Sequence, residues 1–202
     1  NLGCPFLLFS DPRLEGGAFY LGSEELENKI KETIQYYLDY LGLTSKDLIL
    51  SGLSMGTFPS LYYGAAFEPS AVIVGKPLAN IGTIAKRGRL DAPGVFNTSF
   101  DILRHQTGGV GYQHMDDLDR RFWEMFKKAD FKQTTFGLSY MKDEDMDSNA
   151  YDQLVEHLCY TGAKILSKGT AGRHNDDTDT NVTWFLHFYH IILESDFRRG
   201  VQ

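Results

Sequence analysis

Residues 47–56 read DLILSGLSMG, and this stretch decides the fold. The apolar run at 47–51 has the length and composition of a buried β-strand, whereas the small and apolar residues at 57–67 favour a helix. Between them, the five residues at 52–56 match the pattern Gly-x-Ser-x-Gly, with Ser54 at the centre. The stretch therefore predicts a strand, a tight turn that carries a serine, and a helix.

Chemistry explains the spacing of this pattern. On such a turn the serine backbone is strained and the hydroxyl stands above the sheet, so small residues are expected two positions before and two positions after it. The first amides of the following helix point at the reaction centre and can stabilise an oxyanion. We therefore expect Ser54 to be a nucleophile and the backbone N–H of Met55 to be one oxyanion-hole donor.

Short apolar runs alternate with helical patterns over the rest of the chain, which favours a parallel sheet covered by helices. The expected strands are Pro5–Ser10, Asp47–Ser51, Ala71–Gly75, Thr135–Met141 and Lys164–Ser167. The expected helices, besides that at 57–67, lie between Ser23 and Gly42 and over about 118–129, 149–160 and 180–195. Together with the serine turn, this order predicts a single α/β domain over residues 1–202, of the α/β-hydrolase fold.

The segment 77–111 does not fit this alternation, since it is rich in glycine and has weak periodicity. We expect an irregular, lid-like insertion there. It carries a basic cluster in an otherwise acidic chain, formed by Lys86, Arg87, Arg89 and Arg104. These side chains either form a solvated face or contact an anionic donor or partner.

The partners of the serine should follow in the order acid, then histidine. The strand expected at 135–141 runs directly into the acidic turn KDEDMD at 142–147. Any one of its four carboxylates could hold an imidazole, and the others could face solvent or cap the next helix. The four are Asp143, Glu144, Asp145 and Asp147.

Of the six histidines, His174 alone follows the last expected strand and precedes the last expected helix. Loops at the carboxyl ends of parallel strands are where such folds place their chemistry, so we expect His174 to be the general base. The remaining histidines lie in helical patterns or flank the irregular segment: His105, His114, His157, His187 and His190.

A second oxyanion-hole amide should come from a loop after an upstream strand. The candidate loop is SDPR at 10–13, followed by Gly16 and Gly17. An ordinary turn would have the same composition, and the sequence does not name the amide.

The composition excludes several other classes of protein. The net charge of −7 argues against a nucleic-acid partner, because phosphate binding requires a basic surface. Since no apolar run approaches the roughly 20 residues of a membrane span, we do not expect a transmembrane protein. Cys4 and Cys159 stand in no metal-binding or redox spacing, and we expect no metal. The chain starts at Asn1, without Met, and we read it as part of a longer protein.

With these motifs, the chain resembles a protein family of Gram-positive bacteria. This family is the second of the three accessory secretory proteins of the accessory Sec system. The matching pieces are FSDPR at 9–13, AFY at 18–20, SGLSMGT at 51–57, residues 140–147, and GRHND at 172–176. The resemblance implies O-acetylation of N-acetylglucosamine on serine-rich-repeat adhesins before export. It also implies a triad of Ser54, Glu144 and His174, and the choice of Glu144 among the acidic residues rests on it.

The resemblance further implies the partners and the place of action. These are the other accessory secretory proteins, the accessory Sec ATPase and the adhesin itself, in the cytoplasm or at the membrane-bound translocase. No tightly bound cofactor is expected; the acetyl donor is left open, with acetyl-CoA as one candidate. Two alternatives stand beside this reading: a carbohydrate deacetylase or carboxylesterase with the same triad, and a non-catalytic scaffold of the secretion complex.

Overall fold

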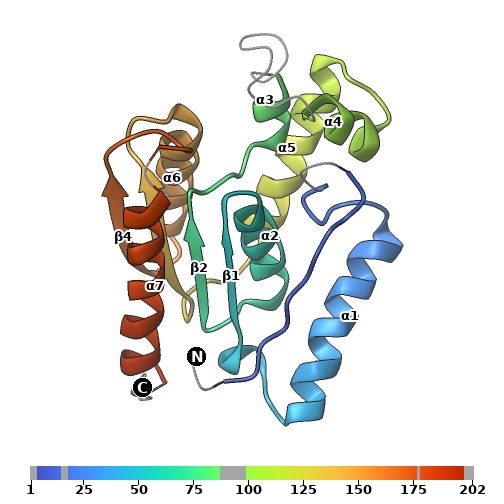
Figure 1. Cartoon of the computed structure of the whole chain (residues 1–202). Coiled ribbons are helices and arrows are strands. Elements are labelled where there is room, and N and C mark those ends of the chain that lie inside the picture. The colour runs from blue at the N-terminus through green and yellow to red at the C-terminus, as the bar shows by residue number, and fades with distance from the viewer. Residues whose placement is uncertain (1–3, 15–17, 87–98, 177, 198–202) are drawn as a thin grey trace.

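A four-stranded parallel sheet forms the centre of the protein (Figure 1). The computed structural model describes residues 4–14, 18–86, 99–176 and 178–197. The strands lie side by side in chain order: β1 (Ile49–Leu53), β2 (Ala71–Gly75), β3 (Thr135–Met141) and β4 (Lys164–Thr170). Because all pairs are parallel, the carboxyl ends of the four strands meet at one edge of the sheet.

Helices cover both faces of this sheet. On one face α7 packs against β2 and β3, and on the other lie α2, α5 and α6 (Figure 1). Two short 3₁₀ turns, at Ser45–Asp47 and Ser54–Gly56, flank β1. The α-helices are α1 (Glu24–Leu41), α2 (Thr57–Phe67), α3 (Ile81–Lys86), α4 (Ser99–Thr107), α5 (Tyr112–Phe126), α6 (Asp145–Leu158) and α7 (Thr178–Ser195).

The sequence of β2 shows why both faces are covered. All five of its residues are buried, and they alternate between the two layers. Val72 and Val74 join the large core beneath α2, α5 and α6, whereas Ala71 and Ile73 join the smaller core beneath α7. A continuous apolar strand of this kind is typical of a parallel sheet with helices on both sides. The larger core is filled by aromatic rings, among them Phe58, Phe122, Phe126, Phe131 and Phe136.

Helix α1 begins and ends where its sequence predicts. The Ser23 hydroxyl accepts a hydrogen bond from Leu26 N at the amino end, and Gly42 adopts the left-handed conformation at the carboxyl end. One acidic residue of its first turn, Glu27, is buried. It accepts hydrogen bonds from Tyr62 in α2 and from Arg121 in α5. This network ties three helices together beside the sheet.

Most of the expected elements are present, with one exception. The strands predicted at 71–75 and 135–141 match those observed, and the other two differ by two or three residues at their ends. The strand predicted at Pro5–Ser10 is wrong, since this segment has no regular structure. Phe6 and Leu8 expose 85% and 88% of their surface, so the apolar run does not lie inside a sheet.

The segment 77–111 contains more regular structure than its weak periodicity predicts. Helices α3 and α4 lie within it, and α5 begins six residues before the predicted start. Short helices give few turns of pattern, but their apolar residues do reach the core, as with Ile81 and Leu103. Residues 87–98, with Arg87 and Arg89 of the basic cluster, lie outside the described residues.

Candidate active site

The serine turn joins β1 to α2 and is strained as its sequence predicts. Ser54 has φ of +50°, a conformation that costs an L residue free energy and that is usual for the central serine of this motif. It starts a 3₁₀ turn, and the hydroxyl of Thr57 donates to Ser54 O at 2.6 Å. Helix α2 follows at once, and eight of its eleven residues are buried.

The two glycines of the motif have different structural roles. A Cβ on Gly52 would lie 2.1 Å from the carbonyl oxygen of Gly56 and 2.9 Å from its Cα, which is too close for any side chain. A Cβ on Gly56 would meet nothing within 4 Å, and its φ of −68° suits any residue. The expectation of a steric need at both positions is therefore right for Gly52 and wrong for Gly56.

His174 lies where the serine needs a base. It follows β4 and comes back over the end of β1, and its Nε2 is 2.8 Å from Ser54 Oγ although the two residues are 120 positions apart in the chain. His174 is 5% exposed. For the hydroxyl to donate, Nε2 must be unprotonated, so the ring proton of the neutral imidazole sits on Nδ1. This pair is the hydrogen-bonded nucleophile and base of a serine hydrolase site.

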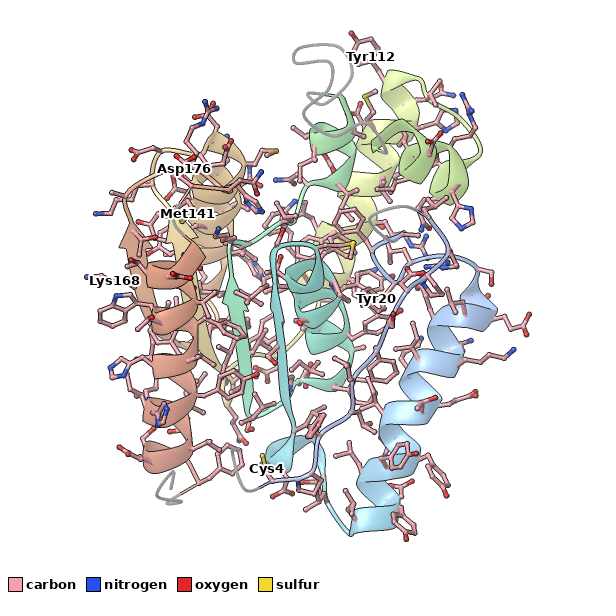
Figure 2. The ribbon with its side chains drawn as sticks, viewed as in Figure 1. Cys4, Tyr20, Tyr112, Met141, Lys168 and Asp176 are labelled. Carbon is pink, nitrogen blue, oxygen red and sulfur yellow. The ribbon has the colours of Figure 1, made fainter. Side chains whose placement is uncertain are left out.

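The loop that carries His174 is fastened to the end of β3. The amide of Gly172 donates to Asp143 Oδ2 at 2.7 Å, and the amide of Asp143 donates to Gly172 O. Gly172 itself has φ of +101°, which favours glycine. Figure 2 shows Met141 and Asp176 close together at this edge, and a Cβ on Gly172 would contact both side chains.

Asp143 thus has a role that the sequence did not reveal. We expected it to face solvent or to cap α6, and its side chain is indeed exposed, but it also fixes the backbone of the histidine loop. Asp145 is exposed at the start of α6, whereas the side chain of Asp147 lies outside the described part of the chain.

Glu144 stands at the start of α6 and contacts the loop that carries His174. It is the N-cap residue of α6, three residues after the end of β3, and its side chain is only 13% exposed. Its carboxylate lies 3.5 Å from the guanidinium Nε of Arg173, the neighbour of His174. The structure thus brings Glu144 to the histidine loop. Its hydrogen bond to the imidazole remains a prediction.

Lys76 is a residue of the site that sequence reasoning missed. It follows β2 with φ of +57°, is 5% exposed, and its ammonium group donates to the backbone carbonyl of His174. Its own amide donates to Ser139 O at 2.7 Å. A lysine directly after the apolar run AVIVG, at the carboxyl end of a predicted strand, is the signal that could have identified it.

The loop expected to supply the second oxyanion amide is organised around Asp11. This carboxylate accepts from the amides of Arg13, Ala18 and Tyr20 and from the guanidinium of Arg13. Burial pushes the pKa of Asp11 upward, but these hydrogen bonds outweigh it and lower the pKa to about 2. Because those three amides are already donated to Asp11, they are poor candidates for the oxyanion hole.

Two hollows lie near these residues. The larger, of about 710 Å³, runs along the edge of β1 and is lined mostly by apolar side chains of residues 4–9, α1, β1 and α2. The smaller, of about 140 Å³, lies between α3 and α6 at the carboxyl edge of the sheet.

The other histidines take no part in this arrangement. His157, His187 and His190 lie in α6 and α7, as predicted. His105 and His114, which were expected only to flank the irregular segment, lie in α4 and α5. Within the described ranges, no group of three His, Cys, Asp or Glu side chains could hold a metal ion. None of the helices there is long and apolar enough to cross a membrane.

Comparison with known sequences identifies close relatives. Residues 1–199 match the family described as the accessory Sec system GspB-transporter. An accessory Sec system protein of Streptococcus gordonii is 54% identical over 98% of this chain and 39% of its own length. Another, of Staphylococcus aureus, is 46% identical over 98% of this chain and 38% of its own length. The chain therefore spans about two-fifths of the length of these relatives.

Solved structures give the same picture of the fold. A chain of the Glycosylation Associate Protein (Gap123) complex from Streptococcus agalactiae is 44% identical, with a TM-score of 0.88 over 94% of this chain and 37% of that one. A capsule O-acetyltransferase of Neisseria meningitidis serogroup A is 18% identical, with a TM-score of 0.67 over 92% of this chain and 73% of that one. An acylaminoacyl peptidase of Pyrococcus horikoshii is 12% identical, with a TM-score of 0.56 over 88% of this chain and 28% of that one. The last two likenesses concern the fold alone, and they confirm the predicted class of a parallel sheet flanked by helices.

Proposed function

The chain belongs to the accessory Sec system GspB-transporter family, and on this premise we propose that it is the catalytic domain of a serine-dependent O-acetyltransferase. Its acceptor is N-acetylglucosamine on a serine-rich-repeat adhesin, which is modified before export. The catalytic residues of this proposal are Ser54, Glu144 and His174, with the amide of Met55 in the oxyanion hole.

One observation supports this proposal more than any other. The strained turn presents Ser54 Oγ 2.8 Å from His174 Nε2, which is within the range for proton transfer between nucleophile and base. Structural packing alone does not need this pair, since a strained serine backbone costs free energy and persists mainly at functional sites.

The first half of the reaction makes an acyl-enzyme. His174 Nε2 removes the proton of Ser54 as Oγ attacks the acetyl carbonyl of the donor. The amide of Met55 and a second donor stabilise the oxyanion, which in comparable sites contributes about 3–4 kcal/mol for each donor. The tetrahedral intermediate collapses, the bond to the leaving group breaks, and His174 returns the proton to that group. The acetyl group is then an ester on Ser54.

The second half transfers the acetyl group to the sugar. A sugar hydroxyl gives its proton to His174 and attacks the ester, after which the proton passes to Ser54 Oγ as the ester bond breaks. Water in the place of the sugar would give an esterase with the same residues. Exclusion of water from the acceptor position therefore separates transfer from hydrolysis, and we assign this duty to the segment 77–111.

Glu144 and Lys76 both hold His174 in this scheme, Glu144 through the imidazole and Lys76 through the backbone. The carboxylate of Glu144 accepts from the Nδ1–H of His174 and stabilises the imidazolium that forms in each half-reaction. Lys76 acts through the backbone, because its ammonium group holds the carbonyl of His174. Lys76 is a positioning residue rather than a catalytic one.

We place this activity in the accessory Sec export pathway, at the cytoplasmic side of the translocase. Family membership supports this place, and the likeness to a chain of the Gap123 complex supports assembly with other accessory secretory proteins. The adhesin and the accessory Sec ATPase are the further partners of the proposal. Acetyl-CoA is our candidate for the acetyl donor.

Two other functions use the same observations differently. A deacetylase or carboxylesterase would have the same Ser54–His174 pair, with water as the acceptor. A scaffold of the secretion complex would need neither the strained serine nor the buried base, so the intact pair favours an enzyme.

Mass spectrometry of the adhesin from cells that carry either the natural protein or Ser54→Ala tests the proposal. Acetylated N-acetylglucosamine should be present in the first strain and absent from the second. The amount of protein and its binding to partner proteins should be equal in both strains, since the change removes one oxygen. Unchanged acetylation in the Ser54→Ala strain would reject the proposal, whereas a gain of acetyl groups would identify a deacetylase.

A further inference from the structure

The smaller hollow, between α3 and α6, has an uncharged lining. All of the described side chains that line it are uncharged: Asn80, Thr83, Ile84, Met146, Asn149 and Gln153. Three of these six are amides, and they stand beside two apolar side chains. Such a mixture fits a neutral ligand that has both hydroxyl or amide groups and an apolar face.

Hydrogen bonds fix the direction of two of the three amides in this cleft, those of Asn80 and Gln153. The indole Nε1–H of Trp123 can only donate, so the atom of Asn80 at 2.7 Å from it must be the oxygen Oδ1. Asn80 Nδ2 therefore points to Gln153, whose Oε1 accepts at 2.9 Å. The amide nitrogen of Gln153 then faces away from Asn80. The cleft thus offers a preset donor, held by a chain of three side chains that begins at a tryptophan.

Hydrogen bonds link the chain segment that enters the cleft to the serine turn. Leu78 N donates at 2.8 Å to the hydroxyl of Thr57, which in turn donates at 2.6 Å to Ser54 O. Asn80 comes two residues after Leu78, so their Cα atoms are at most about 7 Å apart. On the opposite wall, Met146 comes two residues after Glu144. In Figure 1, α3 and α6 stand on the two sides of the carboxyl end of β2.

We propose that this amide-lined cleft is the acceptor subsite, which binds a neutral sugar bearing an amide or hydroxyl group and directs one of its hydroxyls toward Ser54. The proposal rests on the proposed function, because it gives a place to the acceptor of that reaction. Gln153 and Asn149 supply hydrogen bonds, and Ile84 and Met146 contact the apolar face or the acetamido methyl group. An anionic donor finds no cation among the described side chains of this cleft and binds elsewhere.

Binding of methyl N-acetyl-β-glucosaminide, measured by saturation-transfer difference NMR on the purified protein, tests the subsite without the need for turnover. The variants are Gln153→Ala and Asn149→Ala, both exposed positions of α6 where alanine favours the helix. The matched control is Gln35→Ala, an exposed glutamine of α1 that bonds only within its own helix among the described contacts. Each cleft variant should weaken binding by about 3- to 10-fold, the size of one lost hydrogen bond, and the control should not.

Ser54→Ala should bind the sugar as the natural protein does, which separates the subsite from the chemistry. Absence of sugar binding in the natural protein, or equal binding in the cleft variants and the control, would overturn the subsite. Labelling by a fluorophosphonate probe, run in parallel, reports on the proposed function itself. Labelling of Ser54 together with unchanged binding in Gln153→Ala would leave the enzyme standing and reject its acceptor site. Loss of sugar binding in Gln153→Ala without any labelling of Ser54 would support the sugar subsite and reject the proposed enzyme.

Discussion

Exchange of each motif glycine for alanine is a sharp test of the serine turn, because sequence and structure disagree about one of them. The Gly-x-Ser-x-Gly pattern treats both glycines alike. In the structure, the added methyl group of Gly52→Ala would lie 2.1 Å from the Gly56 carbonyl oxygen, whereas that of Gly56→Ala would meet open space. The two variants add the same methyl group four residues apart, so each serves as the control of the other.

The size of the effect follows from these distances. Ordinary contact begins near 3.4 Å, so the backbone around Ser54 must open by about 1.3 Å to accept Gly52→Ala. Overpacking against side chains costs about 1–3 kcal/mol, and a backbone neighbour yields less, so we expect a loss of about 3 kcal/mol or more. Gly56→Ala keeps its φ of −68° and should change stability by less than about 1 kcal/mol, in the stabilising direction.

Urea unfolding of the two variants and the natural protein gives the comparison. With a slope of about 2–3 kcal/mol per molar urea, the midpoint of Gly52→Ala should fall by at least about 1 M, and that of Gly56→Ala should hardly move. Probe labelling of Ser54 should be slowed in the folded fraction of Gly52→Ala, because opening the turn moves the hydroxyl away from His174. Equal losses in both variants, or a Gly52→Ala midpoint like that of the natural protein, would refute the reasoning about this turn.

Three further changes test the surroundings of the pair. Glu144→Gln should lower the turnover of p-nitrophenyl acetate by orders of magnitude with little change in unfolding, as amide-for-acid changes in triads do. Asp143→Asn should lose far less turnover, because its amide oxygen can still accept from the histidine loop. A larger loss of turnover in Asp143→Asn than in Glu144→Gln would show that the wrong carboxylate was chosen. Lys76→Met should lower kcat while leaving the KM for the sugar acceptor nearly unchanged, because the loss of the ammonium group frees the backbone carbonyl of His174. An unchanged kcat would show that Lys76 does not position His174. The pKa of Asp11 is lowered from 3.8 to about 2, so its stabilising effect is complete above about pH 4 and is lost as the pH falls toward 2. Asp11→Asn should therefore lose at most about 2.4 kcal/mol at pH 7. Urea midpoints measured from pH 2 to 7 should fall less steeply in acid than those of the natural protein, and parallel curves would contradict this assignment.

Much of the fold was accessible to sequence reasoning because its strongest signals are local. A buried strand such as 71–75 is an uninterrupted apolar run, and Ser23 and Gly42 mark the two ends of α1 with local capping chemistry. The run at 5–10 has the same appearance, but hydrogen bonding to a neighbouring strand is a long-range property that apolar composition does not encode. The helices within 77–111 are short, and a few turns leave too little periodicity to predict.

The same contrast between local signals and long-range contacts applies to the candidate site. Ser54 and His174 could be predicted to lie together because the carboxyl ends of parallel strands share one edge, and their order in the chain fits the expected topology. The contacts of Lys76 and Asp143 with the histidine loop join distant parts of the chain through backbone atoms, which carry no residue-specific signal. The choice of Glu144 among its acidic neighbours came from family resemblance, and its test is the pair of variants above.

Covalent labelling of Ser54 is the most direct test of the central claim that this residue is an activated nucleophile. The purified protein is treated with a fluorophosphonate, digested, and mapped by mass spectrometry beside Ser54→Ala and His174→Ala. We expect the label on the peptide that contains Ser54, none in Ser54→Ala, and labelling slowed by orders of magnitude in His174→Ala, because the base lies 2.8 Å from the hydroxyl. Equal labelling of all three proteins, or a label on another residue, would contradict the assignment of Ser54.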